Sequence, residues 1–403
     1  MIRLDVIGGA YHEYCIEPHW EEIYGSGFRA AHALSGFGLE LHFHTYADQE
    51  VKAFLDFFAE NYGLQLNSHD VDLSVSFSYT QPLASPSYFP IQTAFSKVKP
   101  LTTGPVDGCI LFGMIEGDAI VDAKRVVYDP QNPNSPTSFW ANGSMAKELV
   151  IVMNMGEATA FTQCKSIEDI ADFLFTNENI VGAVIKNGPQ GAYVLESGSI
   201  THTPAYKTDK VWPIGTGDIF TAYFGYQWII KGEPIGTAAR LASLVTAYYA
   251  ESPVLPLLGD YPQHLEPFLM DKMATAKVYL AGPFFTMGQR WMVNEFRNTL
   301  LSFGLPVFSP LHDVGLGEAD QVVEPDLNAL NQCGVVLALL DGKDLGTVFE
   351  VGYAVAKGIP VLAFLENEKR SDLTMLIGSG CEFENDFSSC IYKIFWLLNK
   401  KIS

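Results

Sequence analysis

The sequence has few basic residues, and its cysteines form no recognisable pair. Lys and Arg together number 25 against 46 Asp and Glu, which gives a formal net charge of −21. A protein that binds a nucleic-acid backbone or an anionic membrane needs a basic surface, so we expect neither as a partner. The six cysteines include no CxxC pair and no zinc spacing. This excludes a disulfide scaffold and favours a reducing compartment.

Long apolar runs are also missing. The run at 335–340 is far too short to cross a bilayer. The first residues, MIRLDVIGGA, interrupt their apolar stretch with Asp5 and lack a cleavable secretory pattern. We therefore expect a cytoplasmic protein.

The length of 403 residues and the apolar fraction of 48% are enough for two or three domains with packed cores. Two segments, 2–9 and 277–285, each show an apolar β-rich run, a glycine turn and a helix-like stretch. The stretch 252–277 between them is rich in proline and irregular in period. We place a boundary there, which gives domains at 1–272 and 273–403.

The alternation of strand and helix patterns predicts an α/β protein with parallel sheets, whose sites lie at the carboxyl ends of strands. In the first domain the strands are expected at 2–7, 109–115, 149–153 and 182–186, with hairpin-like pieces at 121–128 and 192–202. Its helices are expected at 26–36, 50–62, 166–175, 218–231 and 234–250. In the second domain the expected strands are 277–281, 305–308, 335–340 and 360–364, and the expected helices are 288–303, 324–331, 347–357 and 385–398.

The most informative stretch of the second domain is 335–364. A buried strand ends at Leu340, a loop with glycines and two aspartates follows, and the next helix begins with Thr347 and Glu350. In the first helical turn the helix dipole would favour an ionised Glu350 by roughly 0.3–1 kcal/mol. An ionised carboxylate in a pocket is what a nucleophile toward an anomeric carbon requires. The alternative is that Thr347 and Glu350 form a capping box with a purely structural role.

VYLAGPFF (278–285), DLNALNQCGVVLALLDG (326–342) and DLGTVFEVGYAVAKGIPV (344–361) resemble the nucleoside 2-deoxyribosyltransferase family. The resemblance implies a flavodoxin-like parallel sheet and double displacement at C1′ of a nucleoside. It assigns Glu350 as the nucleophile that forms a glycosyl-enzyme, Asp326 as the acid that protonates the departing base, and Tyr279 as the residue that orients the nucleophile. Packing alone is the alternative role for Tyr279.

The same resemblance assigns Asp344 to a sugar hydroxyl. Four residues around the strand ends are expected to contact the substrate: Gly282, Pro283, Asp341 and Gly346. Gly282 and Pro283 could instead serve only as a turn. The acidic cluster, to which Glu324 also belongs, would repel a phosphate and favours an unphosphorylated nucleoside. A nucleotide substrate, and water as the acceptor, stay open. No cofactor is expected for this half.

The first domain carries a glycine pair before an amphipathic helix, in WPIGTGDIF (212–220). Backbone N–H groups at such a helix start can hold a phosphate, so Gly215, Thr216 and Gly217 are candidates for an anion hole. Asp218 would be positioned to take a proton from a substrate hydroxyl during phosphoryl transfer. An N-cap role for this aspartate is the alternative.

Four segments in order, 25–38, 149–158, 184–194 and 212–230, resemble the PfkB, or ribokinase-like, carbohydrate kinases. The resemblance implies a three-layer α/β/α fold with Asp218 as the base. It also implies ATP near Lys186–Gly191, with Lys186 and Gly188 as binding residues, and near the helix after Asp218. Mg²⁺ and phosphates would be organised by Asn154 and Glu157, although that pair could be only a capping box.

This sequence departs from the kinase pattern at the sugar end. Arg29 stands where the family usually has a sugar-binding asparagine, and Glu13 aligns with the usual aspartate. Trp212–Ile214 replaces the usual Asp-Thr-Thr. Either the acceptor is unusual, or this half binds a nucleotide without much turnover. No side chains show the spacing of a metal site of the protein's own, since His42 and His44 lack a third ligand.

The leading hypothesis is a bifunctional enzyme of nucleoside or sugar metabolism, in which one half breaks or exchanges an N-glycosidic bond and the other phosphorylates a sugar or nucleoside with ATP. The second hypothesis is a glycohydrolase that depletes nucleotides or NAD in a defence or toxin setting, with the kinase-like half as a sensor or scaffold. The third is a binding or assembly module with two degenerate sites. On resemblance, we expect a homo-oligomer.

Overall fold

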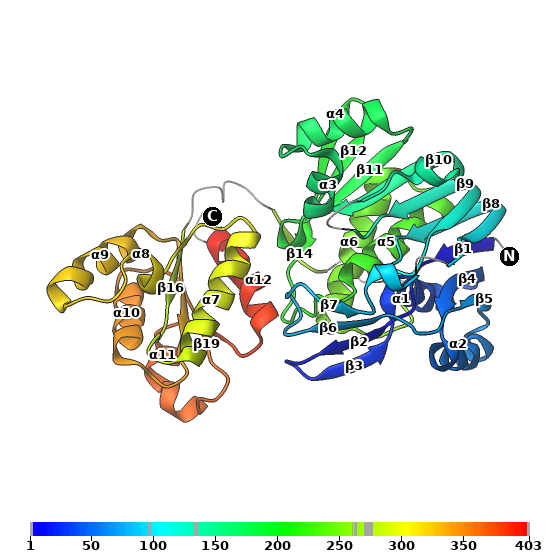
Figure 1. Cartoon of the computed structure of the whole chain (residues 1–403). Coiled ribbons are helices and arrows are strands. Elements are labelled where there is room, and N and C mark those ends of the chain that lie inside the picture. The colour runs from blue at the N-terminus through cyan, green and yellow to red at the C-terminus, as the bar shows by residue number, and fades with distance from the viewer. Residues whose placement is uncertain are drawn as a thin grey trace. The chain divides into compact units, whose positions relative to one another are not determined.

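The computed structural model describes residues 3–95, 98–132, 136–259, 261, 264–269 and 277–400. The chain divides into two compact units (Figure 1). The N-terminal unit comprises Met1–Thr208 and Trp212–Phe268, and the C-terminal unit comprises Asp209–Val211 and Leu269–Ser403. The boundary expected near residue 272 lies outside the described residues and stays a prediction.

The N-terminal unit is built on a sheet that has nine strands in the described residues, in the order β13-β12-β11-β10-β9-β8-β1-β4-β5. The seven strands from β11 to β5 run parallel, and the two at the other edge form an antiparallel hairpin. Their bounds are β1 (Arg3–Ile7), β4 (Glu40–Ala47), β5 (Gln65–Asp70), β8 (Leu101–Phe112), β9 (Ala119–Asp129), β10 (Met145–Asn154), β11 (Gly182–Lys186), β12 (Ala192–Glu196) and β13 (Ser199–Thr203).

One expected hairpin is wrong and the other is confirmed. The segment 121–128 lies in β9, which pairs parallel to both β8 and β10. The segment 192–202 does form the hairpin of β12 and β13. Strand β8 is long and shifts register between Thr103 and Val106, an irregularity that the apolar pattern does not reveal.

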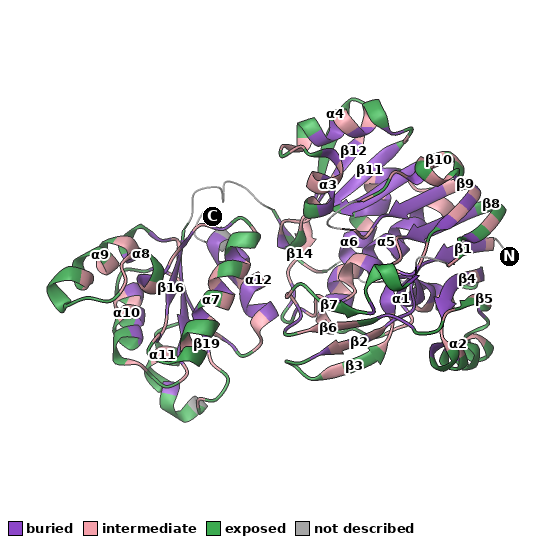
Figure 2. Ribbon diagram, in the orientation of Figure 1, coloured by how far each residue is buried: buried purple, intermediate pink, exposed green. Residues whose placement is uncertain are grey.

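Successive residues of a strand point to opposite faces of the sheet, so apolar strand residues form a core on each face. Helices cover both of these faces. On one side Ile110, Val127 and Val150 share a core with helices α1 (Gly25–Leu34), α2 (Gln49–Tyr62), α5 (Thr216–Gly225) and α6 (Ile235–Glu251). On the other side Leu111, Val126 and Ile151 pack with α3 (Met155–Thr162) and α4 (Ile167–Asn177). Figure 2 shows the sheet as a buried layer between them. The expected three-layer α/β/α arrangement is confirmed.

Two smaller sheets complete this unit. A four-stranded sheet in the described residues has the order β3-β2-β6-β7 and carries Glu13 on β2. Its strands are β2 (His12–Cys15), β3 (Trp20–Ile23), β6 (Ser76–Tyr79) and β7 (Ser87–Phe89). A two-stranded sheet joins β14 (Ala205–Tyr206) and β15 (Pro267–Phe268).

The C-terminal unit has a parallel sheet of five strands in the described residues, in the order β17-β16-β18-β19-β20. The strands are β16 (Val278–Ala281), β17 (Val307–Phe308), β18 (Val335–Leu339), β19 (Val361–Phe364) and β20 (Glu382–Glu384). In chain order this is 2-1-3-4-5, the flavodoxin-like arrangement, whose ligand crevice lies where the strand order reverses, between the first and third strands. The expected fold class is therefore confirmed for this unit as well.

The helices of the C-terminal unit are α7 (Met287–Ser302), α8 (Pro310–Asp313), α9 (Ala319–Gln332), α10 (Leu345–Ala356), α11 (Thr374–Gly378) and α12 (Phe387–Lys400). Leu330 of α9 and Val351 of α10 share a core with Val336 of β18. Phe296 of α7 contacts the rings of Phe364 and Phe387. Within the described ranges of the whole chain, no helix has the length and apolarity to cross a membrane.

Candidate functional site

The carboxylate of Glu350 and the hydroxyl of Tyr279 form the centre of the candidate site in the C-terminal unit. Tyr279 lies on β16 and is fully buried, and its Oη donates a hydrogen bond to Oε1 of Glu350 at 2.5 Å. Tyr279 also stacks on Phe308, with ring centroids 5.4 Å apart, which fixes the plane of the phenol. The helix that carries Glu350 follows β18, so the pair lies at the expected switch point between β16 and β18.

Helix α10 is not capped by the box of Thr347 and Glu350 that the sequence offered as an alternative. Asp344 is the N-cap, and its Oδ2 accepts hydrogen bonds from the backbone N–H and the hydroxyl of Thr347, at 2.8 and 3.0 Å. The capping box of Thr347 with Glu350 is therefore wrong, and so is the expected place of Glu350 in the first turn. Glu350 lies in the second turn, free of any capping role, and its hydrogen bond to Tyr279 joins the helix to the sheet.

Burial dominates the electrostatics of this pair. The pKa of Glu350 is raised to about 7: burial is the largest cause, the hydrogen bond from Tyr279 opposes the rise, and the charges of Asp326 and Asp344 add to it. Burial also raises the pKa of Asp326 to about 6. Oδ1 of Asp326 is buried and has no hydrogen-bond partner within the described part of the chain. Two carboxyl groups that titrate near neutrality thus lie within electrostatic reach of each other.

The other residues expected to contact substrate divide into two groups. Asp341 accepts the backbone N–H groups of Glu366 and Asn367, both at 2.9 Å, so it fastens the loop after β18 to the loop after β19. Gly282 follows β16, and a Cβ atom there would lie 3.1 Å from Cβ of Leu339. Pro283 is buried, and Gly346 lies in the first turn of α10. The structure thus brings Tyr279, Asp326, Asp344 and Glu350 together and commits Asp341 to the loops.

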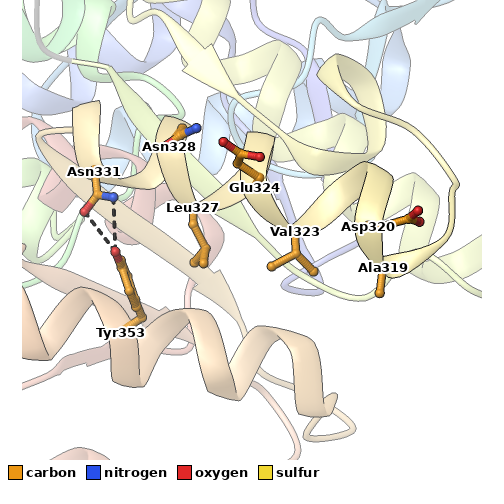
Figure 3. Close-up of a pocket in the computed structure, with 8 residues that line it drawn as sticks. All are labelled: Ala319, Asp320, Val323, Glu324, Leu327, Asn328, Asn331 and Tyr353. Carbon is orange, nitrogen blue, oxygen red and sulfur yellow. Dashed lines mark hydrogen bonds between the residues drawn. The ribbon is translucent and has the colours of Figure 1, made fainter.

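A cavity of about 490 Å³ lies beside α9 (Figure 3). It is lined by residues of α9 and by Tyr353 of α10, whose hydroxyl accepts a hydrogen bond from Nδ2 of Asn331 at 3.1 Å. Its acidic lining residues are Asp320 and Glu324. Neither Glu350 nor Asp326 lines it, so the cavity does not contain the carboxyl pair.

In the N-terminal unit Asp218 is the centre of a buried ion network. It is the third residue of α5, so the alternative N-cap role is wrong, and Gly215 is the N-cap instead. Nη1 of Arg29 donates to Oδ2 of Asp218 at 2.7 Å, and Nε2 of Gln131 donates to Oδ1 at 2.8 Å. Arg29 also forms an ion pair with Glu13, which in turn accepts the backbone N–H of Gly25 at 3.0 Å.

The turn before α5 is in close contact with two basic side chains. Gly215 has a φ of +81°, and a Cβ atom there would lie 2.3 Å from Nε of Arg29, so only glycine fits. A Cβ atom at Gly217 would lie 3.4 Å from Nζ of Lys186. Thr216 uses both its N–H and its hydroxyl on the carbonyl of Pro213, at 3.1 and 2.8 Å. The N–H of Thr216, one of the three residues of the predicted anion hole, thus already has a hydrogen-bond partner within the turn.

Sequence reasoning missed Asp129, which ends β9. Nζ of Lys186 and the hydroxyl of Thr221 both donate to its Oδ2 at 2.8 Å. Asp129 is 1% exposed, and its Oδ1 has no partner among the described residues. The available signal was an aspartate directly after the apolar run VVY and before Pro130, at the carboxyl end of a strand.

Asn154 and Glu157 form the capping box of α3, with N–H to carboxamide and N–H to carboxylate distances of 2.9 and 2.8 Å. Burial and the charge of Asp129 raise the pKa of Glu157 to about 7. Gly188 begins the short turn Gly188–Gln190 between β11 and β12. Across the described ranges, His, Cys, Asp and Glu form no group of three or more that could hold a metal ion. A Mg²⁺ ion here would therefore be held largely by nucleotide phosphates and water, as Mg²⁺ prefers.

Comparisons with known proteins agree with the family resemblance of each unit. Residues 120–253 match the pfkB family carbohydrate kinases, and residues 278–387 match the nucleoside 2-deoxyribosyltransferases. No curated protein matches the chain. The nucleoside kinase of Methanocaldococcus jannaschii, an archaeal member of the ribokinase family, is 14% identical with a TM-score of 0.50, over 64% of this chain and 95% of that one.

A fructokinase of Vibrio cholerae O395, solved with fructose, ADP and calcium, is 14% identical with a TM-score of 0.49, over 62% of this chain and 93% of that one. At 14% identity, the similarity to the archaeal nucleoside kinase shows the fold alone. The two units are thus α/β domains of two enzyme classes. The chain joins a PfkB-family kinase domain to a nucleoside-deoxyribosyltransferase-like domain.

Proposed function

We propose that the C-terminal unit breaks the N-glycosidic bond of a nucleoside and passes the sugar to another base or to water, through a glycosyl-enzyme at Glu350. The observation that carries the proposal is the part-buried hydrogen bond of 2.5 Å from Tyr279 to this carboxylate. A tyrosine hydroxyl that donates to one oxygen orients the other oxygen and stabilises the ionised form, which is the form that attacks.

In the first step an oxygen of Glu350 bonds to C1′ while the bond from C1′ to the base breaks, and its electron pair leaves with the base. Asp326, whose pKa burial raises to about 6, donates its proton to the departing base in the molecules in which it is protonated. In the second step a new base, or water, gives a proton to the ionised Asp326 and bonds to C1′, while the bond from C1′ to Glu350 breaks and its electron pair returns to the carboxylate. The raised pKa values suit these roles, because both groups can change protonation state near neutral pH.

Asp344 supports an unphosphorylated sugar. Its Oδ2 is held by the cap of α10, and its Oδ1 is not used by that cap, so Oδ1 can accept a sugar hydroxyl. A phosphate at the same end would meet the charges of Asp344 and Glu350. The substrate class we propose is therefore a nucleoside or deoxynucleoside.

For the N-terminal unit we propose binding of ATP with Mg²⁺. The N–H of Gly217, in the first turn of α5, would face the phosphates, with Lys186 beside them and Gly188 near the nucleotide. Asn154 and Glu157 would organise the ion and its water. Transfer of the phosphoryl group to a sugar or nucleoside would use Asp218 as the base.

The second candidate function is depletion of nucleotides or NAD by the C-terminal unit, with the kinase-like unit as a nucleotide sensor. A specific observation favours it over a working kinase: both carboxylate oxygens of Asp218 are held by side chains of the chain itself, Arg29 and Gln131. A base that is held in this way is poorly placed to take a proton from an acceptor.

The test is a panel of nucleosides, nucleotides and NAD incubated with the full chain, with the free base measured by chromatography. We expect release from nucleosides or deoxynucleosides, and loss of release in Glu350→Ala. The matched control is Glu295→Ala, on α7. Release that persists in Glu350→Ala would refute the site, and release from NAD or nucleotides alone would select the second candidate.

A further inference from the structure

Arg29 is enclosed on every side that the structure describes, although a kinase would need a sugar to enter there. The side chain is 1% exposed. Its guanidinium pairs with Glu13 and Asp218 and lies 4.8 Å from the centre of the Tyr24 ring. Its Nε and Cδ lie directly over Gly215, where a Cβ atom would approach them to 2.3 and 2.4 Å.

The carboxylate that a kinase would use as its base is engaged at both of its oxygens by this arrangement. Asp218 is 9% exposed, and each of its oxygens accepts a hydrogen bond of 2.7–2.8 Å from a side chain of the unit. The donors come from Arg29 on α1 and Gln131 after β9, which are far apart in the sequence. Two elements thus converge to hold a single carboxylate.

We propose that Arg29 occupies the acceptor position of the N-terminal unit, so that this unit binds a nucleotide without transferring its phosphoryl group to a sugar or nucleoside. The proposal rests on the nucleotide binding proposed above. Transfer would require an acceptor hydroxyl to form a bond to the terminal phosphorus, the bond from that phosphorus to ADP to break, and the hydroxyl proton to pass to Asp218. With Arg29 in place, the hydroxyl has no room beside Gly215 and the carboxylate is already paired.

The ion network also explains why Arg29 does not simply move aside. Withdrawal of the guanidinium would leave Glu13 and Asp218 buried and close to each other with no cation between them. Isolated buried charges are costly, and removing one partner of a buried pair is strongly destabilising. A neutral sugar brings no charge that could replace the guanidinium. The network therefore stabilises the fold of the unit at the expense of the acceptor site.

The first arm of the test measures turnover in the full chain. ATP and Mg²⁺ are incubated with ribose, deoxyribose, fructose and a set of nucleosides, and ADP formation is followed. We expect no ADP formation that depends on an acceptor. Acceptor-dependent ADP formation that disappears in Asp218→Asn would overturn the proposal. Titration calorimetry with ADP and with ATP is run alongside, so that a failure of nucleotide binding is recognised as a failure of the earlier proposal.

The second arm measures stability and tests the ion network around Arg29 without any ligand. Arg29→Gln removes the cation that pairs with both Glu13 and Asp218, and we expect the melting midpoint of the full chain's N-terminal transition to fall by roughly 6–20 °C. The control is Arg240→Gln, an exposed arginine on α6. A midpoint for Arg29→Gln equal to that of the control would overturn the proposal.

Discussion

Tyr279→Phe removes one oxygen atom and tests the proposed chemistry in the C-terminal unit. The ring keeps its packing against Phe308, and the carboxylate of Glu350 loses its hydrogen bond of 2.5 Å. Hydrogen bonds to charged groups are worth about 1.5–3 kcal/mol. Without this stabilisation less of Glu350 is ionised, so base release below neutral pH slows by about 10- to 150-fold, at 1.36 kcal/mol per factor of ten.

The same substitution has a second signature in the pH dependence. The hydrogen bond from Tyr279 lowers the pKa of Glu350 against the larger effect of burial. Its loss raises that pKa, so the acid limb of the rate profile should move to higher pH. Chromatographic assays of base release from pH 5 to 9 would measure both effects.

Tyr353→Phe is the matched control, because Tyr353 is a tyrosine of the same unit whose hydroxyl bonds only to Asn331 among the described residues. It should keep the wild-type rate within about twofold. If Tyr279→Phe also keeps the wild-type rate and the wild-type pH profile, the hydrogen bond has no part in the chemistry and the reasoning is refuted.

Four further outcomes follow. Glu350→Gln should reduce base release by roughly 10³-fold or more, read by chromatography, and a variant with wild-type release would exclude Glu350 as the nucleophile. Asp326→Asn should slow release by about 10²–10⁴-fold for ordinary bases but much less for a cationic base that leaves without a proton, and equal losses would contradict its acid role. The pH profile should be a bell with its maximum between about 6 and 7, because Glu350 (pKa about 7) is protonated on the acid side and Asp326 (pKa about 6) is ionised on the basic side; a rate flat from pH 5 to 9 would contradict this. Asp344→Ala should lower the free energy of unfolding by about 1 kcal/mol in urea titrations through loss of the α10 cap, and an unchanged midpoint would contradict the cap.

Much of the fold could be predicted because apolar runs and glycine turns are local features. The strand at β18 and the helix after it were expected from a run of valine and leucine followed by a glycine loop. The sheet of β2, β3, β6 and β7 was not expected. Its strands are short and mostly half-exposed, as in SFSY at 76–79, and they lack the apolar alternation that marks a strand.

The error at β9 has a topological cause. A short connection between two strands usually makes a hairpin, and parallel strands usually need a longer crossover. Here β8 and β9 pair in parallel although few residues separate them, and β8 shifts its register along the way. Neither the pairing nor the shift is encoded in the local pattern of apolar residues.

In the two candidate sites, too, local features could be predicted from the sequence and tertiary contacts could not. The family resemblance placed Glu350, Asp326 and Tyr279 in one site, but the sequence offered a capping box of Thr347 and Glu350 where the structure has Asp344 as the N-cap of α10. Arg29 stood out as a departure from the kinase pattern, yet its ion pair joins it to a residue 189 positions later. Such a contact arises from tertiary packing, and a single sequence without a structure gives no sign of it.

The most direct test of the central claim is the detection of a sugar on Glu350. The full chain is incubated with a nucleoside that carries fluorine at C2′, which slows the breakdown of a glycosyl-enzyme, and its peptides are weighed by mass spectrometry. We predict a sugar adduct on the peptide that contains Glu350, and none in Glu350→Gln. Continued release of base with no adduct, or with an adduct on a different residue, would contradict the account.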